Sequence, residues 1–270
     1  MSESDRYIPA EVKRSVRQRC GFGCVICGKP LYEYDHMEEW AKVRKHVAED
    51  ITLLCDQHHK EVTNNLLGRS TVRKANQNPF NLNKDFSVGH RLIYDEDHCA
   101  IILGNGVQHI NKKENGWRWS CAPLLVDMVP LIEVEFEDNH PLISIRLYNK
   151  KNKLLLHVDR NELSYSIDPW DIEFESNRLT IRRASRDIAV KIEFTPPKSI
   201  HIVSGTFYLN GIGFKVNKNG IVLLNDKNFI NGYEIIGCWV GIAVNCHPNV
   251  PAALMFGEVK RFSVNNIIRE

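Results

Sequence analysis

Two pairs of potential metal ligands with equal gaps constrain the first third of this chain. Cys24 and Cys27 are separated by two residues, and so are Cys55 and His58. Two such pairs match a tetrahedral Zn²⁺ site, because each short loop supplies two ligands from one turn of backbone. Buried free thiols and a surface histidine are the alternative, but they do not explain the matched gaps. We therefore predict a structural zinc ion, fully ligated by these four residues.

Three further residues in the same stretch indicate catalysis. Asp35 and His36 are adjacent and lie between the two pairs, and His59 directly follows the last zinc ligand. With these residues the stretch resembles the HNH endonuclease family of ββα-metal nucleases, and specifically the subgroup whose fold is stabilised by two zinc knuckles. The resemblance covers about residues 8–78 and leaves the remaining two thirds of the chain outside it.

The resemblance implies a role for each residue. Asp35 and His59 would bind a catalytic Mg²⁺ or Mn²⁺, and His36 would act as the general base. Asp50 takes the position of the family's central asparagine, which holds the loop of the catalytic histidine; an aspartate accepts hydrogen bonds there but cannot donate them. The family hydrolyses DNA to 3′-hydroxyl and 5′-phosphate ends. By analogy with stand-alone bacterial HNH proteins, the biological role would be a restriction or antiphage effector.

The chemistry of phosphodiester hydrolysis suits this residue set. A divalent metal polarises the phosphate and stabilises the departing oxyanion, while a neutral imidazole, with a pKa near 6.5, takes the proton of the attacking water. Two other functions stay open. A non-catalytic zinc-knuckle module that binds nucleic acid or protein keeps the four zinc ligands but leaves Asp35, His36 and His59 unexplained. A nuclease that cleaves RNA cannot be told from one that cleaves DNA.

Composition places few further limits on function. A hydrophobic content of 43% and a charged content of 25% are those of a soluble globular protein. We see no signal peptide and no apolar run of 18 residues, so we expect a cytoplasmic protein that does not enter a membrane. The net charge of +2 indicates that nucleic acid is bound, if at all, by a local patch.

The expected helix over residues 9–19 supplies such a patch. Its cations, together with one beside the predicted site, are our candidate phosphate contacts: Lys13, Arg14, Arg17, Arg19 and Lys60. An ordinary solvated helix face explains the helix equally well. Beyond it we expect strands at 31–37 and 51–54 and helices at 57–65 and, capped by Ser70, at 71–77. A helix-like insert at 38–49 contains His46, which we interpret as a surface or packing residue.

An asparagine-rich run near residues 78–86 predicts a domain boundary. The fold class is therefore α+β, with an HNH domain with structural zinc at residues 1–82 and an all-β domain at 86–270. Alternating apolar and polar residues predict repeated half-buried strands in the second domain, in a sandwich-like architecture. We expect this domain to recognise a partner, hold a homo-oligomer together or restrain the nuclease, and a small-molecule regulator bound to it is compatible with each role.

Overall fold

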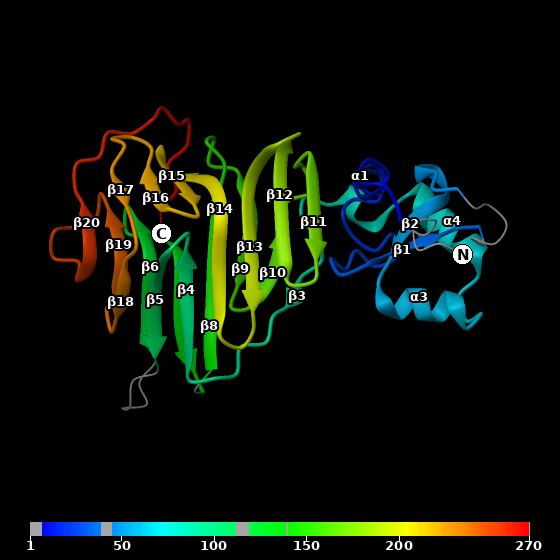
Figure 1. Ribbon diagram of the computed structural model, residues 1–270, viewed down its shortest axis with the longest axis horizontal. Helices are drawn as coiled ribbons and strands as arrows, with labels where there is room; N and C mark the ends of the chain where they lie inside the picture. Colours follow the sequence, from blue (N-terminus) through cyan, green and yellow to red (C-terminus); the bar gives the residue numbers. More distant parts are fainter. Residues whose placement is uncertain (1–6, 39–44, 112–118, 139, 270) are drawn as a thin grey trace. The chain divides into compact units, whose positions relative to one another are not determined.

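The computed structural model describes residues 7–38, 45–111, 119–138 and 140–269, and the chain divides into two compact units. The first unit comprises Met1–His90 together with Ser164–Phe174, and the second comprises Arg91–Leu163 and Glu175–Glu270. The predicted α+β class is confirmed, because helices and a short sheet precede a large region of mixed sheet (Figure 1). The sequence analysis assigned residues 164–174 to the β domain, whereas they belong to the first unit.

The first unit contains the predicted ββα order. Strands β1 (Glu33–His36) and β2 (Ile51–Leu54) pair antiparallel, with Asp35 opposite Thr52, and helix α3 (Asp56–Thr63) follows directly. The other elements are α1 (Ala10–Arg19), α4 (Arg69–Gln77) and the 3-10 helices η2 (Ala48–Asp50) and η3 (Phe80–Asn83). A two-stranded hairpin is marginally stable by itself, so the hairpin of this unit depends on packing against its helices.

The core of the first unit follows from the apolar pattern. All four residues of β2 are buried, as expected of a strand covered on both faces, and Val16 of α1 and Cys20, the C-cap of that helix, belong to the same cluster. The predicted cap of α4 is wrong: Gly68 is the N-cap and Ser70 lies in the first turn. Half of the helix predicted at 38–49 falls on residues 39–44, outside the described residues. The part after it contains only the 3-10 turn η2.

The second unit is built from strands. They are β3 (His90–Arg91), β4 (His98–Leu103), β5 (Gly106–Asn111), β6 (Trp119–Val126), β7 (Val129–Glu137), β8 (His140–Tyr148), β9 (Leu154–Asp159), β10 (Glu162–Tyr165), β11 (Asp171–Glu175), β12 (Arg178–Ala184), β13 (Asp187–Thr195), β14 (Ser199–Leu209), β15 (Ile212–Asn217), β16 (Gly220–Leu223), β17 (Phe229–Ile230), β18 (Glu234–Ile236), β19 (Val240–Val244) and β20 (Ala252–Phe256). β3, β10 and β11 also reach into the first unit. In the described part of the chain, no helix is both long and apolar enough to cross a membrane.

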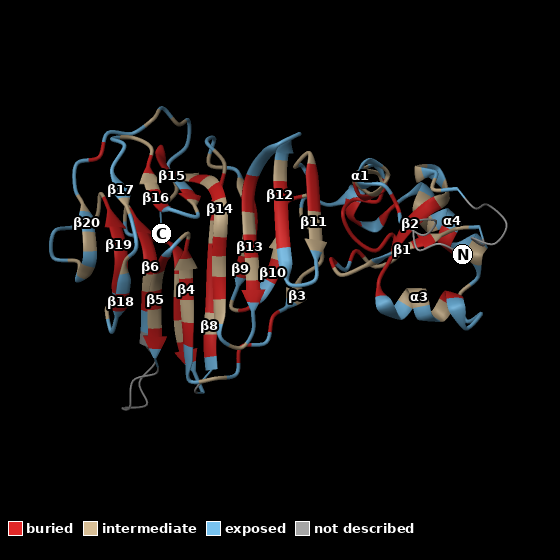
Figure 2. Cartoon of the chain, viewed as in Figure 1, coloured by how far each residue is buried: buried red, intermediate tan, exposed pale blue. Residues whose placement is uncertain are grey.

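The strand pairing is mixed rather than a simple series of hairpins. One run contains β12, β13, β14, β4, β5 and β18, and another contains β20, β19, β6, β7, β8 and β9. They meet where Tyr208 of β14 pairs with Tyr148 of β8. The longest strand of this unit in the described residues, β14, runs without a break through 11 residues. Burial alternates along β4 and β14, as the period-two pattern predicted (Figure 2). The sandwich-like packing of the sheets stays a prediction.

Candidate metal and catalytic site

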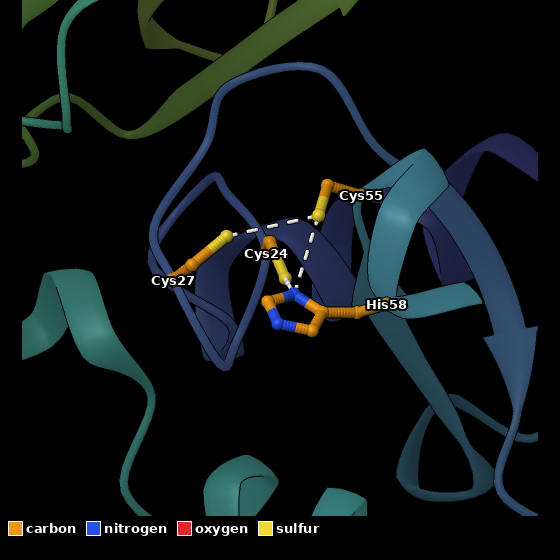
Figure 3. Close-up of side chains that lie close together, drawn as sticks. All are labelled: Cys24, Cys27, Cys55 and His58. Carbon is orange, nitrogen blue, oxygen red and sulfur yellow. Dashed lines mark hydrogen bonds between the residues drawn. The ribbon is translucent and has the colours of Figure 1, made fainter. Parts of the chain in front are cut away.

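The four predicted zinc ligands converge on one point of the first unit (Figure 3). Nδ1 of His58 lies 3.4 Å from Cys24 Sγ and 3.2 Å from Cys55 Sγ, and Cys27 Sγ lies 3.7 Å from Cys55 Sγ. Around a tetrahedral Zn²⁺ with Zn–S bonds of about 2.3 Å, neighbouring sulfur atoms are about 3.8 Å apart. This largely buried Cys₃His group could therefore hold a structural zinc ion. Among the described residues, no other group of this kind occurs.

Backbone hydrogen bonds and one buried amide shape the loop that carries Cys24 and Cys27. The N–H of Val25, in this loop, donates to the carbonyl of Leu53 at 3.0 Å and so connects the loop to β2. Gly28 has a φ of +75°, and a Cβ there would lie 2.3 Å from Oδ1 of Asn81, so no other residue fits. Nδ2 of Asn81, itself fully buried, donates to the carbonyls of Gly21 and Gly28. The sequence analysis missed Asn81, because it read the asparagine-rich run only as a break.

Burial changes the pKa of two of the clustered thiols. Desolvation by burial raises the pKa of Cys24, and it raises that of Cys27 to about 12, with the Cys24 charge adding to the effect. Several thiolates cannot share such a space without a positive charge among them, and a bound dication would supply that charge. Cys20 is also buried, but its Sγ lies near Thr52 and Asn76 and it is not part of the metal group.

The consecutive histidines His58 and His59, on the first turn of α3, face two different groups of residues. Neighbouring helical residues point about 100° apart, so His58 faces the thiols while His59 faces β1. Nε2 of His59 lies 3.5 Å from Oδ1 of Asp35, and its Nδ1 lies 3.0 Å from Oε2 of Glu33. The structure thus brings together Asp35 and His59, the two predicted ligands of the catalytic metal, and adds Glu33. An acidic residue two positions before Asp35 was a period-two signal that the sequence analysis did not use.

Asp35 is buried and is also held by a cation from α4. Nη1 of Arg69 donates to Oδ2 of Asp35 and, at 2.7 Å, to the carbonyl of His36. One oxygen of Asp35 therefore faces the arginine, and the other faces His59. Arg73, one turn further along α4, pairs with Glu38. Neither arginine was predicted as part of the site, because α4 follows the ββα residues that carried the prediction.

The predicted base, His36, lies at the end of β1 and is partly buried. Its Nε2 lies 3.3 Å from Nδ1 of His46, which the sequence analysis took for a surface or packing residue. Burial, followed by the charge of His46, lowers the pKa of His36, while the charges of Asp35 and Asp50 act in the opposite direction. The main-chain carbonyl of Asp50 accepts a hydrogen bond from the N–H of Met37 at 2.8 Å. The backbone of Asp50 therefore contacts the residue that follows His36.

The cations of α1 mostly point into the first unit. Arg17 is 2% exposed, and its guanidinium binds both oxygens of Asp171. Arg19 donates to the carbonyls of Ala48 and Ile51, and Arg14 stacks on Trp170 with 4.6 Å between its guanidinium carbon and the ring centroid. The prediction that Arg17 contacts phosphate therefore does not hold, because partners distant in sequence bury its charge.

The other predicted phosphate contacts lie nearer the surface. Lys13 is half-buried, with its ammonium 5.6 Å from the ring centroids of Tyr7 and Tyr34. Lys60 is exposed on α3, directly after His59. For these two residues the phosphate contact stays a prediction.

A scan against protein-family models, a search of curated proteins and a search of solved structures each found no match to this chain.

Proposed function

We propose that this chain is a metal-dependent endonuclease of the HNH type that hydrolyses phosphodiester bonds in DNA. The observation that carries the proposal is the approach of Asp35 and His59 across the ββα element, 3.5 Å apart, beside the Cys₃His group. A zinc knuckle that only binds would need neither a buried carboxylate facing an imidazole nor a histidine at the end of β1. This arrangement favours a nuclease over a binding module.

The donor atoms of Asp35 and His59 fit a divalent cation. Two oxygen or nitrogen donors of one Mg²⁺, each at about 2.0–2.1 Å, lie about 3 Å apart in an octahedral shell. The observed 3.5 Å between Oδ1 and Nε2 is close to this value. When bound, Mg²⁺ or Mn²⁺ would supply Lewis-acid stabilisation of the phosphate and of the leaving oxygen. Because one donor is an imidazole nitrogen, we expect Mn²⁺ to support activity at least as well as Mg²⁺.

The residues of the chain account for the other requirements of hydrolysis. His36 takes the proton of the attacking water, and its lowered pKa keeps the ring neutral at neutral pH, as a base must be. Arg69 fixes the orientation of Asp35 and the end of β1 through a charge-assisted contact. The Cys₃His group, with all positions taken by protein, would stabilise the fold and take no part in the reaction.

Cleavage of a supercoiled plasmid and of RNA, in parallel and with added Mg²⁺ or Mn²⁺, tests this proposal. The wild-type chain is expected to nick the plasmid, and His36→Ala to lower the rate on the order of 10²–10⁴-fold with unchanged zinc content. His98→Ala, which removes an exposed histidine of the second unit, is the matched control and should leave the rate unchanged. A His36→Ala variant as active as wild type would exclude the assigned base. Preferential digestion of RNA would change the substrate.

By analogy with stand-alone bacterial HNH proteins, we propose restriction or antiphage defence as the biological role. Bacteria that express the wild-type chain are expected to resist infection by at least some phages. The same bacteria expressing His36→Ala, at an equal protein level, should be sensitive. Equal protection by the two proteins would mean that nuclease activity is not the source of resistance.

A further inference from the structure

Strand β1 presents two carboxylates on one face. Side chains two residues apart on a strand point the same way, so Glu33 and Asp35 share a face of the β1–β2 hairpin. His59, on the first turn of α3, lies between them, with Glu33 Oε2 at 3.0 Å from Nδ1 and Asp35 Oδ1 at 3.5 Å from Nε2. Each ring nitrogen of His59 therefore has its own carboxylate.

Only the shorter of these two contacts has the length of a hydrogen bond. A distance of 3.0 Å is that of an ordinary N–H···O hydrogen bond, whereas 3.5 Å lies beyond the usual range. A neutral imidazole carries one proton, which the shorter contact assigns to Nδ1, where it is donated to Glu33. The lone pair of Nε2 then points toward an oxygen of Asp35. Two electron-rich atoms that face each other in this way suit a cation between them.

We infer that Glu33 is a positioning residue for the divalent cation. Its carboxylate accepts the Nδ1–H of His59, and thereby sets the tautomer and orientation of the ring that presents Nε2 beside Asp35. Histidines that bind metals commonly donate their other N–H to a carboxylate, which also makes the ligand more basic. The inference rests on the proposed function and deepens it, because it adds the residue that prepares the metal-binding nitrogen.

Glu33 does not itself belong to the ligand set. Its oxygen contacts the nitrogen on the opposite side of the ring from Asp35. Within the described residues, Glu33, Asp35 and His59 do not form a group of three donor atoms around one point. Glu33 also contributes little to the fold, since its side chain is 58% exposed and exposed ion pairs contribute little to stability. Its removal should therefore change the metal site and leave the unit folded.

Mn²⁺ titration of the zinc-loaded full chain tests this role without measuring catalysis. Glu33→Ala is expected to weaken Mn²⁺ binding by about 10–100-fold, the usual cost of losing a carboxylate behind a histidine ligand. Glu33→Gln keeps an oxygen acceptor and should retain most of the affinity. Glu61→Ala removes a glutamate of α3 whose carboxylate accepts a hydrogen bond from Gln57, and serves as the matched control with unchanged affinity.

Nitrogen-15 NMR of the histidine rings supplies the second readout, on zinc-loaded protein without Mn²⁺ and at a pH where imidazole is neutral. His59 is expected to be protonated at Nδ1 in the wild type and in Glu33→Gln, and to show a mixture of tautomers in Glu33→Ala. Wild-type Mn²⁺ affinity and an unchanged tautomer in Glu33→Ala would overturn the role of Glu33, even if plasmid cleavage upholds the nuclease. A wild-type chain that neither binds Mn²⁺ nor cleaves would overturn both proposals.

Discussion

Replacing Asp171 with alanine should destabilise the first unit severely, although this residue lies 154 positions from its partner. Nε and Nη2 of Arg17 donate to the two oxygens of Asp171 at 2.9 and 2.8 Å, and the two side chains are 3% and 0% exposed. Nη1 of Arg17 also contacts Glu173 and the hydroxyl of Tyr34, each at 2.9 Å. Asp171→Ala leaves the guanidinium of Arg17 buried, without its two contacts to Asp171, while those to Glu173 and Tyr34 remain.

The size of the effect follows from this burial. Removing one partner of a buried ion pair costs about 3–5 kcal/mol, because the other charge remains without compensation. Glu173 stays beside Arg17 but is partly exposed, so we expect a value of about 3 kcal/mol. Glu38→Ala is the matched control: it breaks an ion pair with Arg73 in the same unit, but at the surface, where the cost is at most about 1 kcal/mol.

The assay must report on the first unit alone, because a chain with two units need not unfold in one step. Zinc release to a chromogenic chelator, followed against urea concentration, meets this requirement. Asp171→Ala is expected to release zinc at clearly lower urea than the wild type, and Glu38→Ala at nearly the same urea. Combining Asp171→Ala with Arg17→Met should recover much of the loss, since neither charge of the buried pair remains. A shift below about 1 kcal/mol in Asp171→Ala, or an equal shift in the control, would refute the reasoning.

Three other predictions address zinc, pH and assembly. The purified chain should contain about one zinc, and Cys27→Ser should lose it and unfold the first unit, because structural zinc contributes about 10–16 kcal/mol in finger peptides; a folded, zinc-free Cys27→Ser would contradict the ligand set. Burial and the charge of His46 lower the pKa of His36, so kcat/KM should fall only at a pH below the ordinary histidine pKa of about 6.5. His46→Gln should move this acid limb of the pH profile to higher pH. An unmoved limb would exclude the contribution of His46. The β-rich unit should drive homo-oligomerisation, which raises weak DNA affinity through avidity; light scattering that finds a monomer at all concentrations would exclude this role.

The local features of the site could be predicted from the sequence. The matched gaps of Cys24, Cys27, Cys55 and His58 predict a group that could hold a metal ion, and the four side chains do converge, because each pair lies within one turn of backbone. Three of the four residues at 51–54 are apolar, which predicts a strand covered on both faces, and Thr52 is buried with them in β2. Alternation likewise identified many strands of the second unit. In each case, residues close in sequence carry the whole signal.

The tertiary structure decided which charges face inward. Arg17 has the pattern of a surface helix residue, yet Asp171 from a distant segment buries it, and no spacing within α1 records that partner. In the same way, α4 brings Arg69 to Asp35, and chain folding brings His46 to His36. A buried charge is stable only beside its counter-charge, and that pairing depends on positions in space. The sequence by itself determined the candidate ligands and the short elements that carry them, whereas only the folded chain determined their neighbours.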